Sequence, residues 1–132
     1  MTDTPERALS EAENWLASAK YGLTDADGED AAANVCCAQS IHAIIRANDA
    51  LALKFYGHKP TRHDDAAIVF FKLVKEGKLQ PSAARFKELV ARAMRDKSGA
   101  DYGKDEFSLE DAKEYAQNAE EFIAAAKDVL NL

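Results

Sequence analysis

The chain has 132 residues, of which 47% are hydrophobic and 30% are charged, and its net charge at pH 7 is −6. We expect one helical domain over residues 1–132, because this length is typical of a single domain with a sizeable core. The negative charge argues against nucleic-acid binding by the whole surface. Because no apolar run reaches the roughly 18 residues that span a bilayer and the N-terminus lacks a signal-peptide pattern, we expect a cytoplasmic protein with no membrane contact.

Cysteines and histidines give no pattern of a metal or cofactor site. Cys36 and Cys37 are adjacent in an alanine-rich stretch, so they bridge each other with difficulty and do not match the C-x-x-C spacing of zinc sites. His42, His58 and His63 do not lie four residues apart on a helix, as two zinc ligands often do. The sequence therefore predicts no metal, no cofactor and a reducing compartment.

Apolar residues spaced alternately by three and four predict one helix at each end of the chain. Thr4 is the expected N-cap of the first helix, with Pro5 as its first residue. Ser108 is the expected N-cap of the last helix, with Asp111 as its capping-box partner. Both stripes are narrow and rich in alanine, so we expect the two helices to pack together. The stripes are Leu9, Ala12, Leu16, Ala19 and Leu23, and Leu109, Ala112, Ala116, Ala119, Ile123, Ala126 and Leu130.

A central helix is expected from about residue 29 to residue 56. Gly57 should end it in the left-handed conformation, with Pro60 beyond. The helix is apolar over most of its circumference, so other helices should surround it. Its expected core residues are Val35, Cys36, Cys37, Ile41, Ile44, Ile45, Leu51, Leu53 and Phe55.

Two further helices are expected, over about 61–76 with Gly77 as the stop, and from about Pro81 to Gly99. Residues 98–107 should then form a loop. No segment alternates with period two, so the predicted fold class is all-α, an up-and-down bundle of about five helices. The residues expected to be buried in these two helices are Ala66, Ala67, Val69, Phe70, Leu73 and Val74, then Phe86, Leu89, Val90, Ala93 and Met94.

Charge is unevenly distributed along the chain. Residues 1–53 and 98–132 each carry −6, whereas residues 54–97 hold eleven basic side chains against five acidic ones, a local +6. The basic segment is consistent with binding of an anionic ligand. It is equally consistent with a solvated surface, or with a face that docks an acidic partner or the chain's own acidic ends.

Four polar residues of the central helix fall within about 80° of one another at 100° per residue. They are Gln39, His42, Arg46 and Asp49. In one interpretation this polar stripe lines a cleft or a subunit interface, where hydrogen bonds to it would be directional. In the other it is the exposed face of the helix and makes ordinary surface contacts.

The order of several segments resembles the HEPN domain family. These segments are Asp-Ala-Leu-Ala-Leu-Lys at 49–54, Tyr-Gly-His-Lys-Pro at 56–60 and Thr-Arg-His-Asp at 61–64, the last opening a helix. The resemblance continues through Asp-Tyr-Gly at 101–103 and Ser-Leu-Glu-Asp-Ala at 108–112, and it covers nearly the whole chain. It implies a HEPN-like helical fold.

The resemblance implies one of two kinds of function. Many HEPN proteins are metal-independent ribonucleases, active as dimers, whose motif is an arginine followed four to six residues later by a histidine. Here Arg95 and Asp96 match the start of the motif, but Ala100 and Asp101 stand at later positions and neither can replace an imidazole near neutral pH. Other members resemble noncatalytic companions of nucleotidyltransferases in two-component, toxin-antitoxin-like systems.

We therefore expect a noncatalytic HEPN-like module, a homodimer, that binds RNA, a nucleotide or a nucleotidyltransferase-type protein. One alternative is a divergent ribonuclease that uses Arg95 with Tyr102, or with His63. Another is a helical scaffold or regulatory subunit that serves oligomerisation alone. The expected binding residues are Gln39, His42, Arg46, Asp49, Arg92 and Arg95.

Overall fold

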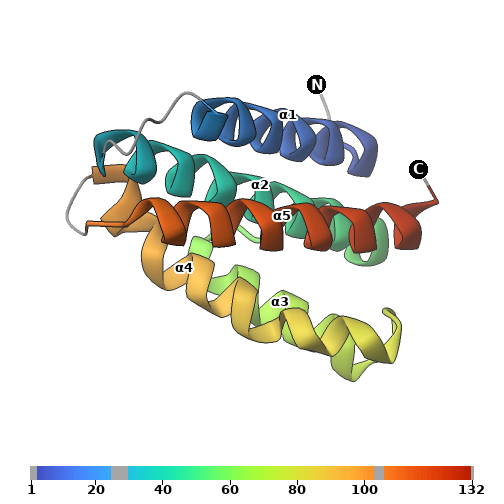
Figure 1. The fold of residues 1–132 in the computed structure, drawn as a ribbon. Helices are drawn as coiled ribbons and strands as arrows, with labels where there is room; N and C mark the ends of the chain where they lie inside the picture. Colours follow the sequence, from blue (N-terminus) through green and yellow to red (C-terminus); the bar gives the residue numbers. More distant parts are fainter. Residues whose placement is uncertain (1–2, 25–29, 103–105, 132) are drawn as a thin grey trace.

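The computed structural model describes residues 3–24, 30–102 and 106–131, without the side chains of residues 30, 31, 63 and 64. This part of the chain is helical and contains no strand, which confirms the predicted all-α fold (Figure 1). The elements are α1 (Pro5–Thr24), α2 (Asp30–Tyr56), α3 (His63–Lys75), the short 3-10 helix η1 (Pro81–Phe86), α4 (Lys87–Tyr102) and α5 (Leu109–Leu130).

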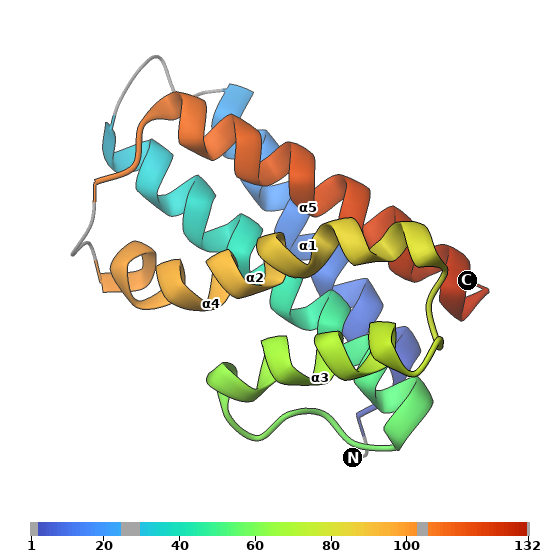
Figure 2. The same ribbon diagram turned by 90° about the horizontal axis from the view of Figure 1, so that it is seen from below.

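Helix α2 is the centre of the bundle, as predicted, and it contacts all four of the other α-helices. Helix α1 runs antiparallel to α2, whereas α5 runs alongside α2 in the same direction (Figure 1). Helices α3 and α4 form an antiparallel pair on the other side of α2 (Figure 2). The expected contact between α1 and α5 is also present, although α1 packs mainly against α2.

Side-chain caps begin the first and last helices as predicted. The Thr4 hydroxyl oxygen accepts a hydrogen bond from the Arg7 backbone N–H at 3.1 Å. In α5, the Ser108 hydroxyl oxygen accepts from the Asp111 N–H at 3.0 Å, and the Asp111 carboxylate accepts from the Ser108 N–H at 2.9 Å. Such caps satisfy backbone donors that have no partner within the helix.

Two of the predicted helix stops are also confirmed. Gly57, which follows α2, has φ 78°, and Gly77, which follows α3, has φ 69°. A side chain is strained in this left-handed region, so glycine is the favoured residue at both positions. The boundaries of the central helices therefore follow from local sequence.

The predicted stop at Gly99 is wrong. Residues 98–102 continue α4 as helix rather than forming a loop, and Gly99 is buried. A glycine inside a helix costs only about 1 kcal/mol relative to alanine. The added turn brings Asp101 within 2.7 Å of Lys97, four residues earlier. The same turn places Asp101 Oδ1 3.2 Å from His42 Nε2 of α2, so both a local and a tertiary contact accompany the extension past Gly99.

Aromatic rings from three elements meet in the core. Phe122 of α5 packs edge-to-face against Phe70 of α3 and Phe86 of η1, with ring centroids 5.5 Å and 5.3 Å apart. All three rings are buried, as predicted for Phe70 and Phe86. This cluster joins the α3–η1 segment to α5, which is far away in sequence.

Val35 does not belong to the core, contrary to the prediction. Its side chain is 56% exposed. It lies on the same face of α2 as Gln39 and His42, which follow it by four and seven residues. Helix α1 borders this face without covering it.

Helices α1 and α2 approach closely at Gly22. A Cβ atom at this position would lie 2.9 Å from the Sγ of buried Cys36, so we expect Gly22→Ala to lower the free energy of unfolding. In a Cys36→Ala background the clash is gone, and the same change should stabilise the protein by about 0.5 kcal/mol through helix propensity. Urea unfolding of the four proteins measures both effects. An equal effect in the two backgrounds would refute the close contact.

Candidate functional site

Three residues of the polar stripe line an open cleft between α1 and α2. They are His42, Arg46 and Asp49, whereas Gln39 lies in a separate groove nearer the start of α2. The cleft has a volume of about 490 Å³. Its other lining residues are Asp3, Arg7, Glu11, Trp15, Ile45 and Lys59.

The Arg46 guanidinium is held by three carboxylates of the chain. Its Nε donates to Glu11 at 2.8 Å, its Nη1 donates to Asp49 at 2.8 Å, and its Nη2 lies 3.2 Å from both oxygens of Asp3. The Arg46 side chain is only 14% exposed. Lys59 lies 3.6 Å from Asp3 and adds a second cation. An external anion would therefore have to displace one of these carboxylates to reach Arg46.

Proton affinities in this cluster follow from burial and from Arg46. Burial raises the pKa of Asp49, although its hydrogen bond to Arg46 opposes the shift. The hydrogen bond from Arg46 instead lowers the pKa of Asp3. Burial disfavours the charged guanidinium, but hydrogen bonds to Asp3 and Asp49 raise the pKa of Arg46. The cluster thus ties the N-terminal segment to the middle of α2.

At the other end of the cleft, His42 joins three helices. Its Nε2 lies 3.2 Å from Oδ1 of Asp101 in α4, and its ring stacks on Trp15 of α1 with centroids 4.7 Å apart. Asp101 also accepts a hydrogen bond from Lys97 at 2.7 Å. The carboxylate and the indole together hold the imidazole in one orientation. The partly exposed indole ring offers a face for stacking against a planar group.

Asp101 gives this contact a pH dependence. Burial opposes ionisation, but the hydrogen bond from Lys97 and the charges of His42 and Lys97 lower the pKa of Asp101 below 3.8. Its ionised form therefore contributes stability at neutral pH that is lost as the pH falls through the lowered pKa. We expect Asp101→Asn to cost about 1 kcal/mol at pH 7. Thermal unfolding between pH 7 and pH 3 should show the gap to the wild type narrowing; a constant gap would refute the ionic contribution.

The two α4 candidates Arg95 and Tyr102 share one exposed face of the helix, seven residues apart. The Arg95 side chain is 62% exposed, and Tyr102 as a whole residue is 75% exposed. Arg95 Nη2 donates to Glu88 at 2.9 Å. A pair between two exposed side chains contributes little, so Arg95 can exchange Glu88 for another anion at small cost.

The remaining candidates lie apart from this face. Arg92 points to α5, where it donates to Glu114 at 3.1 Å and its guanidinium lies 4.7 Å from the centroid of the buried Tyr115 ring. It therefore serves the contact between α4 and α5. The side chain of His63 lies outside the described residues.

Several residues of the site were missed by the sequence analysis. Asp101 was expected in a loop, so its helical spacing from Lys97 was not recognised. Trp15 lies in the first predicted helix, and no local signal indicated its stacking on His42. The four-residue spacing of Lys97 and Asp101, which allows an ion pair on a helix, was the one sequence signal that could have identified Asp101 as helical.

The basic segment 54–97 partly docks onto the chain's own acidic segments. Four of its eleven basic side chains pair with carboxylates from residues 1–53 or 98–132: Lys59 with Asp3, Arg85 with Glu121, Arg92 with Glu114, and Lys97 with Asp101. Six others form no ion pair with a described residue: Lys54, Arg62, Lys72, Lys75, Lys78 and Lys87. The positive charges of these six side chains therefore remain available to an external ligand.

No protein-family model matches the chain, and no curated protein matches it. None of the helices in the described ranges combines the length and apolar character needed to cross a membrane.

Proposed function

We propose that this chain is a noncatalytic binding module of the HEPN type that binds RNA or a nucleotide through the exposed face of α4. The observation that supports this proposal is the exposure of Arg95 and Tyr102 on the same face. A guanidinium can form two parallel hydrogen bonds with a phosphate, and a phenol ring can stack on a base. The lysines of α3, of the loop after it and of the start of α4 form no ion pair with a described residue, and they add sequence-independent attraction.

Binding without cleavage is favoured by the position of His42. It contacts α4 through Asp101, six residues after Arg95, which places the contact about 120° around the helix from Arg95. Acid–base catalysis needs a proton-transferring group within hydrogen-bond reach of the reacting atoms. The imidazole and the exposed guanidinium are directed to different sides of α4, which supports a binding role.

Incubation with labelled structured RNA tests the proposal. The wild type should retain the RNA, with an affinity that falls as salt is raised. Arg95→Ala and Tyr102→Ala should each weaken retention several-fold. Lys113→Ala removes an exposed cation from the acidic α5 segment and should change retention little. Equal retention by all four proteins would refute the role of the α4 face.

The same incubation distinguishes a divergent ribonuclease that uses Arg95 with Tyr102, for which their shared exposed face is the favouring observation. Cleavage that resists a chelator and disappears in Arg95→Ala would replace the binding proposal with the nuclease one.

A protein partner of nucleotidyltransferase type is the second candidate. It is favoured by Tyr102, because exposed tyrosines are frequent anchors of protein interfaces. Absence of RNA retention, together with a 1:1 complex with a nucleotidyltransferase that Tyr102→Ala abolishes, would support this candidate over RNA binding.

A further inference from the structure

A small pocket lies between η1 and the last turns of α5, with a volume of about 170 Å³. Its floor and walls are apolar, because Ala83 and Phe86 of η1 are buried and Ala125 and Val129 of α5 are partly buried. The contact of Phe86 with Phe122 holds the floor in place. Pockets for drug-sized ligands have roughly 300–1,000 Å³. This one therefore suits a group as small as a short aliphatic side chain.

Two charges of opposite sign stand at the exposed rim of this pocket. Arg85 comes from η1 and Asp128 from α5. The Arg85 guanidinium lies 4.2 Å from the centroid of the Phe86 ring, which keeps it beside the pocket. Although both residues line the same small pocket, they do not form an ion pair with each other. Their separation leaves room for a ligand that carries both complementary charges.

Asp128 occupies an unfavourable position for a carboxylate. It lies in the last turn of α5, where the backbone carbonyls of Lys127 and Asp128 accept from the N–H of Asn131. The C-terminal end of a helix carries partial negative charge, so it attracts cations and repels anions. The Asp128 side chain forms no ion pair with a described residue. An ammonium group bound here would be attracted by both the carboxylate and the helix end.

Arg85 can bind a carboxylate at small cost. Its one ion pair with a described residue is with Glu121, and the Nη1–Oε1 distance of 3.7 Å is too long for a hydrogen bond. The two side chains are 58% and 41% exposed, and such pairs contribute little to stability. A guanidinium can instead form two parallel hydrogen bonds with a carboxylate.

We propose that this pocket binds a free amino acid with a small aliphatic side chain. The α-carboxylate pairs with Arg85, the α-ammonium pairs with Asp128, and the side chain occupies the apolar floor. A simple amine or a simple carboxylate would satisfy only one of the two rim charges, whereas a zwitterion satisfies both. Gln80 and Ser82 complete the rim and offer further hydrogen-bonding groups.

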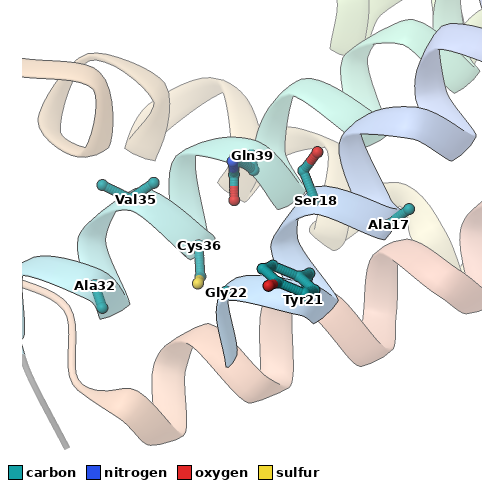
Figure 3. A pocket seen from close by; sticks show the side chains of 8 residues that line it. All are labelled: Ala17, Ser18, Tyr21, Gly22, Ala32, Val35, Cys36 and Gln39. Carbon is teal, nitrogen blue, oxygen red and sulfur yellow. The ribbon is translucent and has the colours of Figure 1, made fainter. Parts of the chain in front are cut away.

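A groove of about 720 Å³ between α1 and α2 provides a contrast. Among the described residues that line it, none is charged (Figure 3). It can hold an apolar group by contact, but it cannot orient a charged head group. The pocket at η1 is also separate from Arg95 and Tyr102, so the inference is independent of the proposed RNA binding.

Titration with L-valine, followed by the amide resonances of the labelled protein, is the first test. The amides of Ser82, Phe86 and Val129 should shift, whereas those of Tyr21 and Val35 in the groove should not. Isobutylamine and isovaleric acid keep the aliphatic group but lack the carboxylate or the ammonium, so each should bind at least about tenfold more weakly. Equal binding of either compound, shifts confined to the groove, or no shift with L-valine would overturn the proposal.

Variants of the rim provide the second test. Arg85→Gln and Asp128→Asn should each weaken L-valine binding at least about tenfold. Lys127→Gln is the matched control, because Lys127 also has a 3.7 Å pair between half-exposed side chains, with Glu13, but does not line the pocket. It should leave binding unchanged. Glu121→Gln should strengthen binding, because it releases Arg85; weaker binding by this variant would contradict the role of Arg85.

Thermal unfolding of the ligand-free proteins separates binding from a structural role. Asp128→Asn removes an anion from the C-terminal end of α5, so its midpoint should equal or exceed that of the wild type. A lower midpoint together with unchanged L-valine binding would make Asp128 a structural residue and overturn the proposal.

Discussion

Arg46→Ala is expected to lower the free energy of unfolding at pH 7 by about 3 kcal/mol. The substitution leaves the Asp49 carboxylate, whose side chain is 10% exposed, buried without its counter-charge. It also releases Asp3, which is 24% exposed, from α2. Glu11 is more exposed and should contribute less to the loss. Urea unfolding followed by circular dichroism measures the change.

Arg95→Ala is the matched control, because it removes the same side chain from an exposed pair in which Arg95 and Glu88 are 62% and 77% exposed. It should cost no more than about 0.5 kcal/mol. Equal losses from the two substitutions would show that the Arg46 cluster is only a surface network. Asp49→Asn in the Arg46→Ala background should restore part of the stability, because it removes the stranded charge.

The stability loss caused by Arg46→Ala should also change with pH in a defined direction. Asp49 already has a raised pKa, and loss of Arg46 raises this pKa further. A carboxyl group whose pKa is higher in the folded state favours folding at low pH, and this contribution is lost as the pH rises through that pKa. The stability deficit of the variant should therefore shrink on moderate acidification. A deficit that grows on acidification would contradict the assignment to Asp49.

Phe122→Ala is expected to cost about 4 kcal/mol, the loss typical of a large ring removed from a close-packed core. Phe122 contacts both Phe70 and Phe86, so its removal leaves a cavity between α5 and the α3–η1 segment. Phe122→Leu keeps most of the volume and should cost about 1.5 kcal/mol. Thermal and urea unfolding give both values.

Phe71→Ala controls for the loss of a phenyl ring as such. This ring is 40% exposed on α3, so its removal opens no enclosed cavity and should cost much less than Phe122→Ala. Comparable losses at positions 71 and 122 would mean that the aromatic cluster does not hold the α3–η1 segment to α5.

The fold was predictable wherever the determining forces are local. Thr4 and Ser108 begin helices because their side chains satisfy backbone donors three residues away, and Gly57 follows a helix because it tolerates the left-handed conformation. These effects are encoded in short stretches of sequence. Periodicity likewise identified most of the core, because each helix has to bury one face.

The site was less predictable because its contacts join residues that are distant in sequence. Arg46 and Asp3 are 43 residues apart, and His42 and Asp101 are 59 residues apart. Periodicity placed Arg46 and His42 on one face of α2, but it could not indicate which side chains from α1 and α4 would meet them. The stop expected at Gly99 failed in part for the same reason, since the turn beyond it carries the contact of Asp101 with distant His42.

Trp15 gives the unmodified protein an internal optical reporter. It is the single tryptophan of the chain, and it borders the cleft that contains Arg46. A ligand that displaces His42 would separate the stacked rings and change the emission intensity of the indole. Intrinsic fluorescence can therefore report occupancy of the cleft without any added label.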